Sequence, residues 1–190
     1  RIFVVMKVLF LDHDGVLCLA TEWGGRRRKQ LLWNRTYPEK AVMYDCDLNT
    51  MNVEYRFDDF NDKAVRILNE ILLETGAEIV VSSDWRFDCT LTEMKEFYDI
   101  FGVIKGPIDY TPTLEVEDFK SLEANGKKGY EDERSIEIKK WLALHPEVTH
   151  WVAVDDLNMS ADLTNFVHTK RQNEGIKQMG IKEKIMSYLQ

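Results

Sequence analysis

The chain contains few cysteines, and they form no recognisable pattern. There are three among 190 residues, an odd number, and none belongs to a CxxC pair. This excludes a disulfide framework and a typical zinc site and favours a reducing compartment, so we predict a cytoplasmic location. Basic side chains are also scarce, 25 against 33 acidic ones. That balance argues against non-specific adhesion to nucleic acid, although it permits a local basic groove.

A long apolar run is absent as well. Residues 1–11 are apolar, but Lys7 interrupts them and no small-residue cleavage pattern follows; the stretch is too short to span a bilayer. We interpret it as a core strand and expect no membrane association. Whether residues 1–5 are native, or the natural start is Met6, stays open. The content of 44% hydrophobic and 31% charged residues is typical of a folded protein, and the length predicts one domain over residues 1–190.

Short apolar runs alternate with amphipathic segments along the chain. The runs at residues 7–11, 78–81 and 149–154 predict buried strands, and a short fourth strand is expected at residues 165–168. Apolar side chains at three- and four-residue spacing predict helices at residues 58–75, 91–101, 132–144 and 181–189, whereas residues 103–125 are expected to be mostly loop. This alternation predicts an α/β fold whose parallel sheet is covered on both faces.

An irregular region, residues 18–57, follows the first predicted strand. Its apolar pieces at residues 31–33 and 41–44 suggest two short strands of a hairpin with Pro38 in the turn. Residues 24–40 include six basic residues and one acidic residue, and Trp23 and Trp33 lie close by in the sequence. The sequence leaves open whether residues 26–29 and Arg35 bind a nucleic-acid backbone or form a solvated loop.

Polar side chains follow three of the predicted strands. These endings are Asp12-His13-Asp14, Ser82-Ser83 and Asp155-Asp156. The carboxyl ends of parallel strands share one edge of a sheet, where ligands bind in open α/β folds. Carboxylates crowded there repel one another unless a cation compensates, and oxygen ligands suit Mg²⁺. Gly15 after the first pair lets the backbone turn and a ligand approach. On the alternative interpretation, the first two aspartates only cap a loop.

This ordered set of endings resembles the motifs of the haloacid dehalogenase (HAD) superfamily of phosphotransferases. Residues 12–16 (DHDGV) fit the first motif, Ser82 the second, and Asp155-Asp156 after residues 151–154 (WVAV) the acidic fourth. The third motif is a single basic residue near the start of the preceding helix. The candidates for it are Arg134, which fits its place, and the competitors Lys127, Lys128 and Lys139.

A finer pattern is similar to the HAD domain of "Swiss Army Knife" RNA-repair proteins. It consists of residues 81–86 (VSSDWR), Thr111-Pro112, the helix from Arg134 to Leu142, and residues 154–156 (VDD). The resemblance implies a three-layer α/β sandwich with a parallel Rossmann-like sheet and a small cap insertion, residues 18–57. It also implies a Mg²⁺-dependent phosphatase for phosphorylated RNA or DNA ends. A small-molecule (nucleotide) phosphatase and a non-catalytic metal-binding interaction module are the alternatives.

The resemblance also implies roles for the motif residues. Asp12 would attack phosphorus and form an aspartyl-phosphate, and Asp14 would act as general acid and base. Mg²⁺ would be held by Asp12, the Asp14 carbonyl and Asp155, with Asp156 as a helper. Ser82 would hydrogen-bond a phosphoryl oxygen and Arg134 would offset its charge.

The residues beside the motifs are open to more than one interpretation. We assign Ser83, Arg86 and Gly15 to substrate binding, although Trp85-Arg86 fits a loop pair packed on the sheet edge equally well. We expect His13 to have a structural role, because alternation along the strand end turns it away from its two aspartate neighbours. The sequence does not predict the oligomeric state.

Overall fold

The computed structural model describes residues 5–44 and 46–190. Its sheet has five strands, all parallel, in the order β3-β2-β1-β4-β5. The strands are β1 (Met6–Leu11), β2 (Glu78–Val81), β3 (Asp109–Tyr110), β4 (Val148–Asp155) and β5 (Phe166–His168). The α/β fold with a parallel sheet is therefore confirmed, and the first predicted strand is confirmed from Met6 onward, residues 1–4 lying outside the described part.

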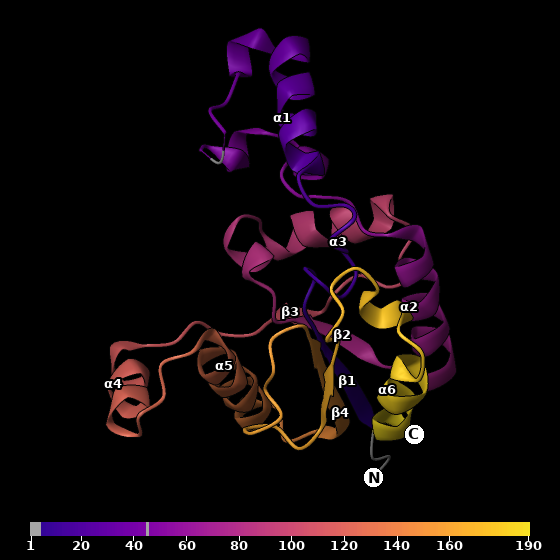
Figure 1. Cartoon of the computed structure of the whole chain (residues 1–190), viewed down its shortest axis with the longest axis vertical. Coiled ribbons are helices and arrows are strands. Elements are labelled where there is room, and N and C mark those ends of the chain that lie inside the picture. Colours follow the sequence, from indigo (N-terminus) through magenta and orange to yellow (C-terminus); the bar gives the residue numbers. More distant parts are fainter. Residues whose placement is uncertain (1–4, 45) are drawn as a thin grey trace.

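Helices lie on both faces of the sheet (Figure 1). The α-helices are α1 (Gly25–Thr36), α2 (Asp62–Thr75), α3 (Leu91–Ile100), α4 (Val116–Ala124), α5 (Tyr130–Leu144) and α6 (Ile181–Leu189). The 3₁₀ helices are η1 (Pro38–Lys40), η2 (Leu48–Thr50), η3 (Val53–Tyr55), η4 (Asp84–Phe87) and η5 (Gly175–Lys177). None of the helices in the described ranges is long and apolar enough to cross a membrane.

Side-chain alternation along the strands divides the core between the two faces. In β1, Leu9 and Leu11 pack with the apolar stripes of α2, α3 and α6. Val8 and Phe10 point the other way and pack against Ile138 and Trp141 of α5. Both sets are fully or almost fully buried, so the three-layer sandwich follows directly from strands that are apolar on both faces.

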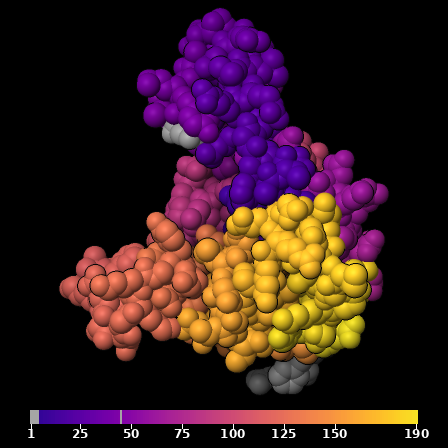
Figure 2. All heavy atoms as spheres, in the orientation of Figure 1, coloured from indigo at the N-terminus to yellow at the C-terminus, as the bar shows by residue number. Residues whose placement is uncertain are grey.

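The insertion, residues 18–57, does not contain the predicted hairpin. It forms α1, η1, η2 and η3 in place of two strands, so that prediction was wrong. Residues 26–35 include no β-branched side chain and several good helix formers, which favours a helix there. Trp33 on this helix packs with Val42 and Met51 in a small separate core. Figures 1 and 2 show the insertion as a lobe that stands off the sheet.

Contacts with the main body hold the base of this lobe. The Asp58 carboxylate accepts hydrogen bonds from the backbone N–H groups of Gly24 (3.2 Å) and Arg26 (2.5 Å) at the start of α1. Arg56 donates to both carboxylate oxygens of Glu93 on α3, at 2.7 and 3.0 Å. Within the insertion, Lys29 donates to the backbone carbonyls of residues 54 and 57 and so joins α1 to the end of the insertion. These contacts fix where α1 leaves the sheet edge.

Two further elements differ from the predictions. Residues 103–125, expected to be mostly loop, contain β3 and α4. Helix α4 buries only Leu122, so its apolar stripe is weak. Helix α2 begins at Asp62, later than predicted, because Asn61 accepts hydrogen bonds from the N–H groups of Lys63 and Ala64, while Asp58 accepts from the start of α1. The other predicted helices are present within a few residues, and the cysteines are all free thiols.

Candidate active site

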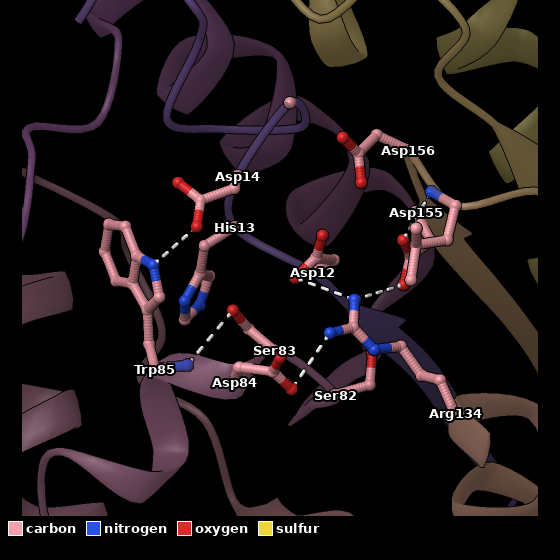
Figure 3. A network of polar contacts seen from close by, with 12 residues as sticks. Asp12, His13, Asp14, Ser82, Ser83, Asp84, Trp85, Arg134, Asp155 and Asp156 are labelled. Carbon is pink, nitrogen blue, oxygen red and sulfur yellow. Dashed lines mark hydrogen bonds and ion pairs between the residues drawn. The ribbon is translucent and has the colours of Figure 1, made fainter. Parts of the chain in front are cut away.

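The carboxyl ends of β1, β2 and β4 lie side by side. Leu11, the last residue of β1, pairs with Val81 of β2 and with Val154 of β4. The pairing continues past the strands, since Ser82 N–H donates to Leu11 O at 3.0 Å and Asp12 N–H donates to Val154 O at 3.1 Å. The three polar endings therefore meet at one edge of the sheet, as the sequence predicts (Figure 3).

Three carboxylates form the centre of this edge. Within the described part of the chain, oxygen atoms of Asp12, Asp155 and Asp156 all lie within 4.8 Å of one another. Asp12 is 3% exposed and Asp155 is fully buried. Burial raises the pKa of Asp12 well above its usual range, and the neighbouring Asp155 raises it further. Burial also raises the pKa of Asp155 to about 6. The folded chain thus concentrates negative charge where water cannot solvate it.

Arg134, on α5, is the positive group that faces these carboxylates. Its Nη1 donates to Asp155 Oδ2 at 2.9 Å and lies 3.3 Å from Asp12 Oδ1, and its Nη2 donates to Asp84 Oδ1 at 3.0 Å. Burial alone would lower the pKa of Arg134, but Asp12 and Asp155 outweigh it, and the pKa is raised. Of the competing residues, Lys127 pairs with Asp162 and Asp132.

The remaining two competitors lie on the surface. Lys128 and Lys139 are exposed side chains. Of the four candidates for the third motif, Arg134 is thus the one that the described structure brings into contact with Asp12 and Asp155.

Asp14 stands apart from the three-carboxylate group. Its Oδ2 accepts a hydrogen bond from Trp85 Nε1 at 2.9 Å. Burial raises the pKa of Asp14, while the hydrogen bond from Trp85 lowers it. Trp85 in turn is stacked on Phe57, with ring centres 4.5 Å apart and planes at 6°. The first motif thus presents two carboxylates in different surroundings, Asp12 among charges and Asp14 against an indole.

His13, between them, points away from the site. Its Nε2 lies 2.8 Å from the hydroxyl of Tyr98 on α3, and the ring is fully buried. Burial, with a smaller effect of Arg134, lowers the pKa of His13 to about 3, so the ring is neutral at physiological pH. This position fits the structural role expected from strand alternation.

Position 15 must be glycine because the side chain of Asp156 packs closely against its backbone. Its φ is +69°, and a Cβ placed there would lie 2.7 Å from Asp156 Oδ2, which is shorter than any normal contact. Thr169 Oγ1 donates to Gly15 O at 3.0 Å and fixes the turn. Any side chain at position 15 would displace Asp156, so the glycine serves the carboxylate cluster.

The two serines that follow β2 differ in whether their hydroxyl groups have a hydrogen-bond partner. Ser82 is 1% exposed, and its Oγ has no hydrogen-bond partner in the described structure. Ser83 accepts a hydrogen bond from Trp85 N–H at 3.4 Å. A buried hydroxyl without a partner is unfavourable, so Ser82 is suited to a ligand that supplies an acceptor.

Arg86 lies in a buried ion pair. Its Nη2 donates to Glu137 Oε1 at 2.7 Å and its Nη1 to Ser83 O at 3.0 Å. Burial raises the pKa of Glu137 to about 7. Arg86 lines neither of the two cavities described next, so its contacts hold the ending of β2 in place.

Two cavities meet at the carboxylates. The smaller, about 210 Å³, is lined by Asp12, Asp14, Ser83, Asp84, Tyr130, Arg134, Asp156 and Leu157. The larger, about 410 Å³, lies under α1 and is lined by Asp14, Trp23, Gly24, Arg26, Tyr44, Phe57, Asp58, Trp85 and Asp156. Sequence reasoning did not single out Asp84, Tyr130 or the Trp85–Asp14 contact, because they depend on long-range geometry that no strand-end pattern carries.

The cluster has the donor set of a magnesium site. Asp12, Asp155 and Asp156 offer only oxygen ligands, which hard cations such as Mg²⁺ prefer. Their negative charge exceeds what the single nearby Arg134 compensates. The residues present therefore fit a divalent cation at this edge of the sheet.

The comparisons with known proteins agree with this arrangement. No curated protein and no solved structure matches the chain. A family model described as the HAD domain in Swiss Army Knife RNA repair proteins matches residues 8–179. That match covers β1 from Val8 onward, the other four strands, and Asp12, Ser82, Arg134 and Asp155. The chain therefore belongs to the family of HAD domains found in Swiss Army Knife RNA repair proteins.

Proposed function

We propose that this protein is a Mg²⁺-dependent phosphomonoester hydrolase that removes phosphate from nucleic-acid ends through an aspartyl-phosphate on Asp12. Membership of the HAD family supports a hydrolase. The observation that carries the proposal is the pairing of a buried Asp12, held 3.3 Å from Arg134, with a separate carboxylate, Asp14, held by Trp85. A nucleophile and a proton carrier in different surroundings are what a two-step displacement requires.

The reaction can be written with these residues alone. An oxygen of Asp12 bonds to phosphorus while the bond from phosphorus to the leaving oxygen breaks, and Asp14 gives that oxygen a proton. Asp14 then takes a proton from a water molecule, whose oxygen attacks phosphorus and releases Asp12. Because burial raises the pKa of Asp14, this carboxyl holds a proton closer to neutral pH than an exposed aspartate does.

The other residues bind and orient the phosphate. Ser82 Oγ, which has no partner within the described part of the protein, would donate to a phosphoryl oxygen, and Arg134 would offset its charge. Mg²⁺ held by Asp12, the Asp14 carbonyl and Asp155, with Asp156 assisting, would neutralise negative charge on the phosphate and the carboxylates when bound. Positioning and electrostatics of this kind account for most of the catalysis of phosphoryl transfer.

The substrate class rests on the family and on the insertion. The family description names RNA repair, and the larger cavity opens beside a basic helix, α1. A cavity of about 410 Å³ also has room for a free nucleotide, so a nucleotide phosphatase is the second candidate. A binding-only module is less favoured, because such a module does not need the proton carrier that Trp85 orients.

The test is phosphate release with Mg²⁺ from three classes of ester. An aryl phosphate, free nucleotides, and single-stranded oligonucleotides phosphorylated at the 3′ or the 5′ end are compared at equal concentration. We expect the oligonucleotides to give the highest kcat/KM. Correctly folded protein that turns over none of them would leave only the binding module, and a preference for free nucleotides would favour the second candidate.

Trp85→Phe tests the role assigned to Asp14. Phenylalanine keeps a ring against Phe57 but removes the donor to Asp14. We expect kcat for a small ring-free ester to fall about 10- to 100-fold, the value of a hydrogen bond to a charged group, with KM little changed. The matched control is Trp151→Phe on β4, whose ring packs on Phe10. Equal kcat for the two variants would mean that the indole serves packing alone.

A further inference from the structure

The larger cavity has one polar end and aromatic walls. Asp14 and Asp156 lie at its catalytic end, Gly24, Arg26 and Asp58 line it near the start of α1, and four aromatic side chains complete its lining. These are Trp23, Tyr44, Phe57 and Trp85. This inference rests on the proposed function, in which a terminal phosphate binds at Asp12. The nucleotide attached to that phosphate then extends either into this cavity or out of the site in another direction.

The aromatic rings of the cavity fall into two pairs. Phe57 and Trp85 are stacked and buried, and they form a flat inner wall. Trp23 and Tyr44, from the insertion, are 42% and 50% exposed. Large exposed aromatic side chains around a cavity suit a flat aromatic ligand, because every nucleobase has a face that stacks on such rings.

Positively charged side chains lie on the same helix-bearing insertion as these exposed rings. Arg27 Cζ lies 5.5 Å from the centre of the Tyr44 ring, and Arg27, Arg28 and Arg35 are exposed on α1. Arg28 and Arg35 are seven residues apart, so they share a face of the helix. Lys29 and Trp33 do not belong to this surface: Lys29 is bound by backbone carbonyls, and Trp33 is 3% exposed.

A second aromatic cavity, lined in part by Arg134, serves as the comparison. Its volume is about 210 Å³, and exposed Phe87, Phe119 and Tyr130 contribute to its lining. It also contains three carboxylates, those of Asp84, Glu133 and Glu137. Each cavity is lined by several aromatic side chains, three carboxylates and one arginine, so the linings alone do not separate them. The first cavity differs in the exposed Arg27 beside its Tyr44 ring, a positive charge that attracts a polyanion.

We propose that the cavity under α1 is a nucleobase subsite: Trp23 and Tyr44 stack the terminal base of a single-stranded nucleic acid, and Arg27, Arg28 and Arg35 bind the phosphates that follow. Helix α1 points away from the sheet edge (Figure 1), so the strand leaves the catalytic centre along the lobe visible in Figure 2. The phosphate is recognised at the sheet edge, and the base and backbone are recognised by the insertion.

Binding to a catalytically inactive protein tests the subsite apart from catalysis. The probe is a short fluorescent oligonucleotide with a terminal phosphate, and its affinity for the Asp12→Asn protein is measured by anisotropy. Adding Trp23→Ala and Tyr44→Ala together is expected to weaken binding about tenfold or more. The same pair should have no effect on a probe whose terminal nucleotide is abasic. Phe119→Ala, 43% exposed in the second cavity, is the matched control and should bind as the parent does.

The salt dependence of oligonucleotide binding tests the phosphate contacts proposed for the arginines. Replacing Arg27, Arg28 and Arg35 with alanine should lower the slope of log affinity against log salt concentration by about 0.7 for each phosphate that an arginine no longer neutralises. Unchanged affinity in the Trp23/Tyr44 variant, or weaker binding in Phe119→Ala instead, would overturn the subsite. Turnover of β-glycerophosphate, which has no base, reports the proposed function separately: its absence would contradict the phosphatase, whereas its presence with unchanged oligonucleotide binding would contradict only the subsite.

Discussion

Replacing Asp12 with asparagine is expected to abolish turnover and, at the same time, to stabilise the folded protein. The loss of the nucleophile should reduce kcat for every phosphate ester by about four to six orders of magnitude, as removal of a covalent nucleophile does in other enzymes. Asparagine has the shape of aspartate, so the packing around position 12 is preserved. The size of the loss distinguishes a nucleophile from a residue that only binds metal or phosphate.

The gain in stability follows from the raised pKa of Asp12. A carboxyl whose pKa is higher in the folded than in the unfolded chain is charged more readily after unfolding, so stability falls as the pH rises through those values. Burial and Asp155 both raise the pKa of Asp12. The gain in stability from the neutral asparagine should therefore be largest near pH 8. It should disappear as the pH falls toward the pKa of an unperturbed aspartate, about 4.

Thermal unfolding in the presence of a chelator measures this effect. We expect Tm of Asp12→Asn to exceed that of the parent by about 3 °C or more at pH 8, since 1 kcal/mol corresponds to about 2–4 °C in a domain of this size. Asp99→Asn, an exposed position on α3, is the control and should change neither kcat nor Tm. Retained turnover in Asp12→Asn would show that the nucleophile is another residue.

The sequence was most informative where strands end. Each of β1, β2 and β4 is an apolar run followed at once by acidic or hydroxyl side chains, and a parallel sheet must bring such endings together. Asp12, Ser82 and Asp155 were therefore predictable as neighbours without any knowledge of side-chain positions. The direction of His13 was also predictable, because side-chain alternation continues two residues past the end of β1.

Features that depend on tertiary contacts were not predictable. A hairpin was predicted from the apolar residues 31–33 and 41–44 with Pro38 between them, whereas residues 31–33 belong to α1, which is held by a small core around Trp33. Trp85 carried no local sign that its indole would reach Asp14, which is 71 residues earlier in the chain. For Arg86 the sequence left substrate binding and packing on the sheet edge equally open, and nothing near it in the sequence indicated its ion pair with Glu137 on α5. In each case the partner, not the residue, decides the role.

The two sides of the catalytic centre have different origins in the sequence. The sheet edge is built from residues that any α/β sheet places together, whereas the cavity under α1 depends on the insertion and its attachment through Asp58 and Arg56. In the proposed function, chemistry and specificity are therefore carried by separate segments. We expect changes in Trp23 or Tyr44 to alter the substrate preference without disturbing the carboxylates, since those rings belong to the insertion.

Arg134→Ala should be the most destabilising single change in the site. Arg134 is 7% exposed and is the cation closest to Asp12 and Asp155 in the described part of the chain. Removing one partner of a buried ion pair leaves the other charges uncompensated, which costs about 3–5 kcal/mol. In a domain of this size that destabilisation lowers Tm by about 6–20 °C. Turnover should fall as well, because the phosphate no longer has the group that offsets its charge.

Magnesium should distinguish electrostatic from packing effects in this variant. A cation bound to the folded state stabilises it by mass action, and in Arg134→Ala it also replaces the missing positive charge. We therefore expect added Mg²⁺ to raise Tm of Arg134→Ala more than that of the parent. Lys139→Ala, an exposed position on the same helix, is the control and should leave Tm, its Mg²⁺ response and kcat unchanged. A larger decrease in turnover in Lys127→Ala or Lys128→Ala than in Arg134→Ala would place the third motif outside α5, because the phosphate would then be recognised by the loop before that helix.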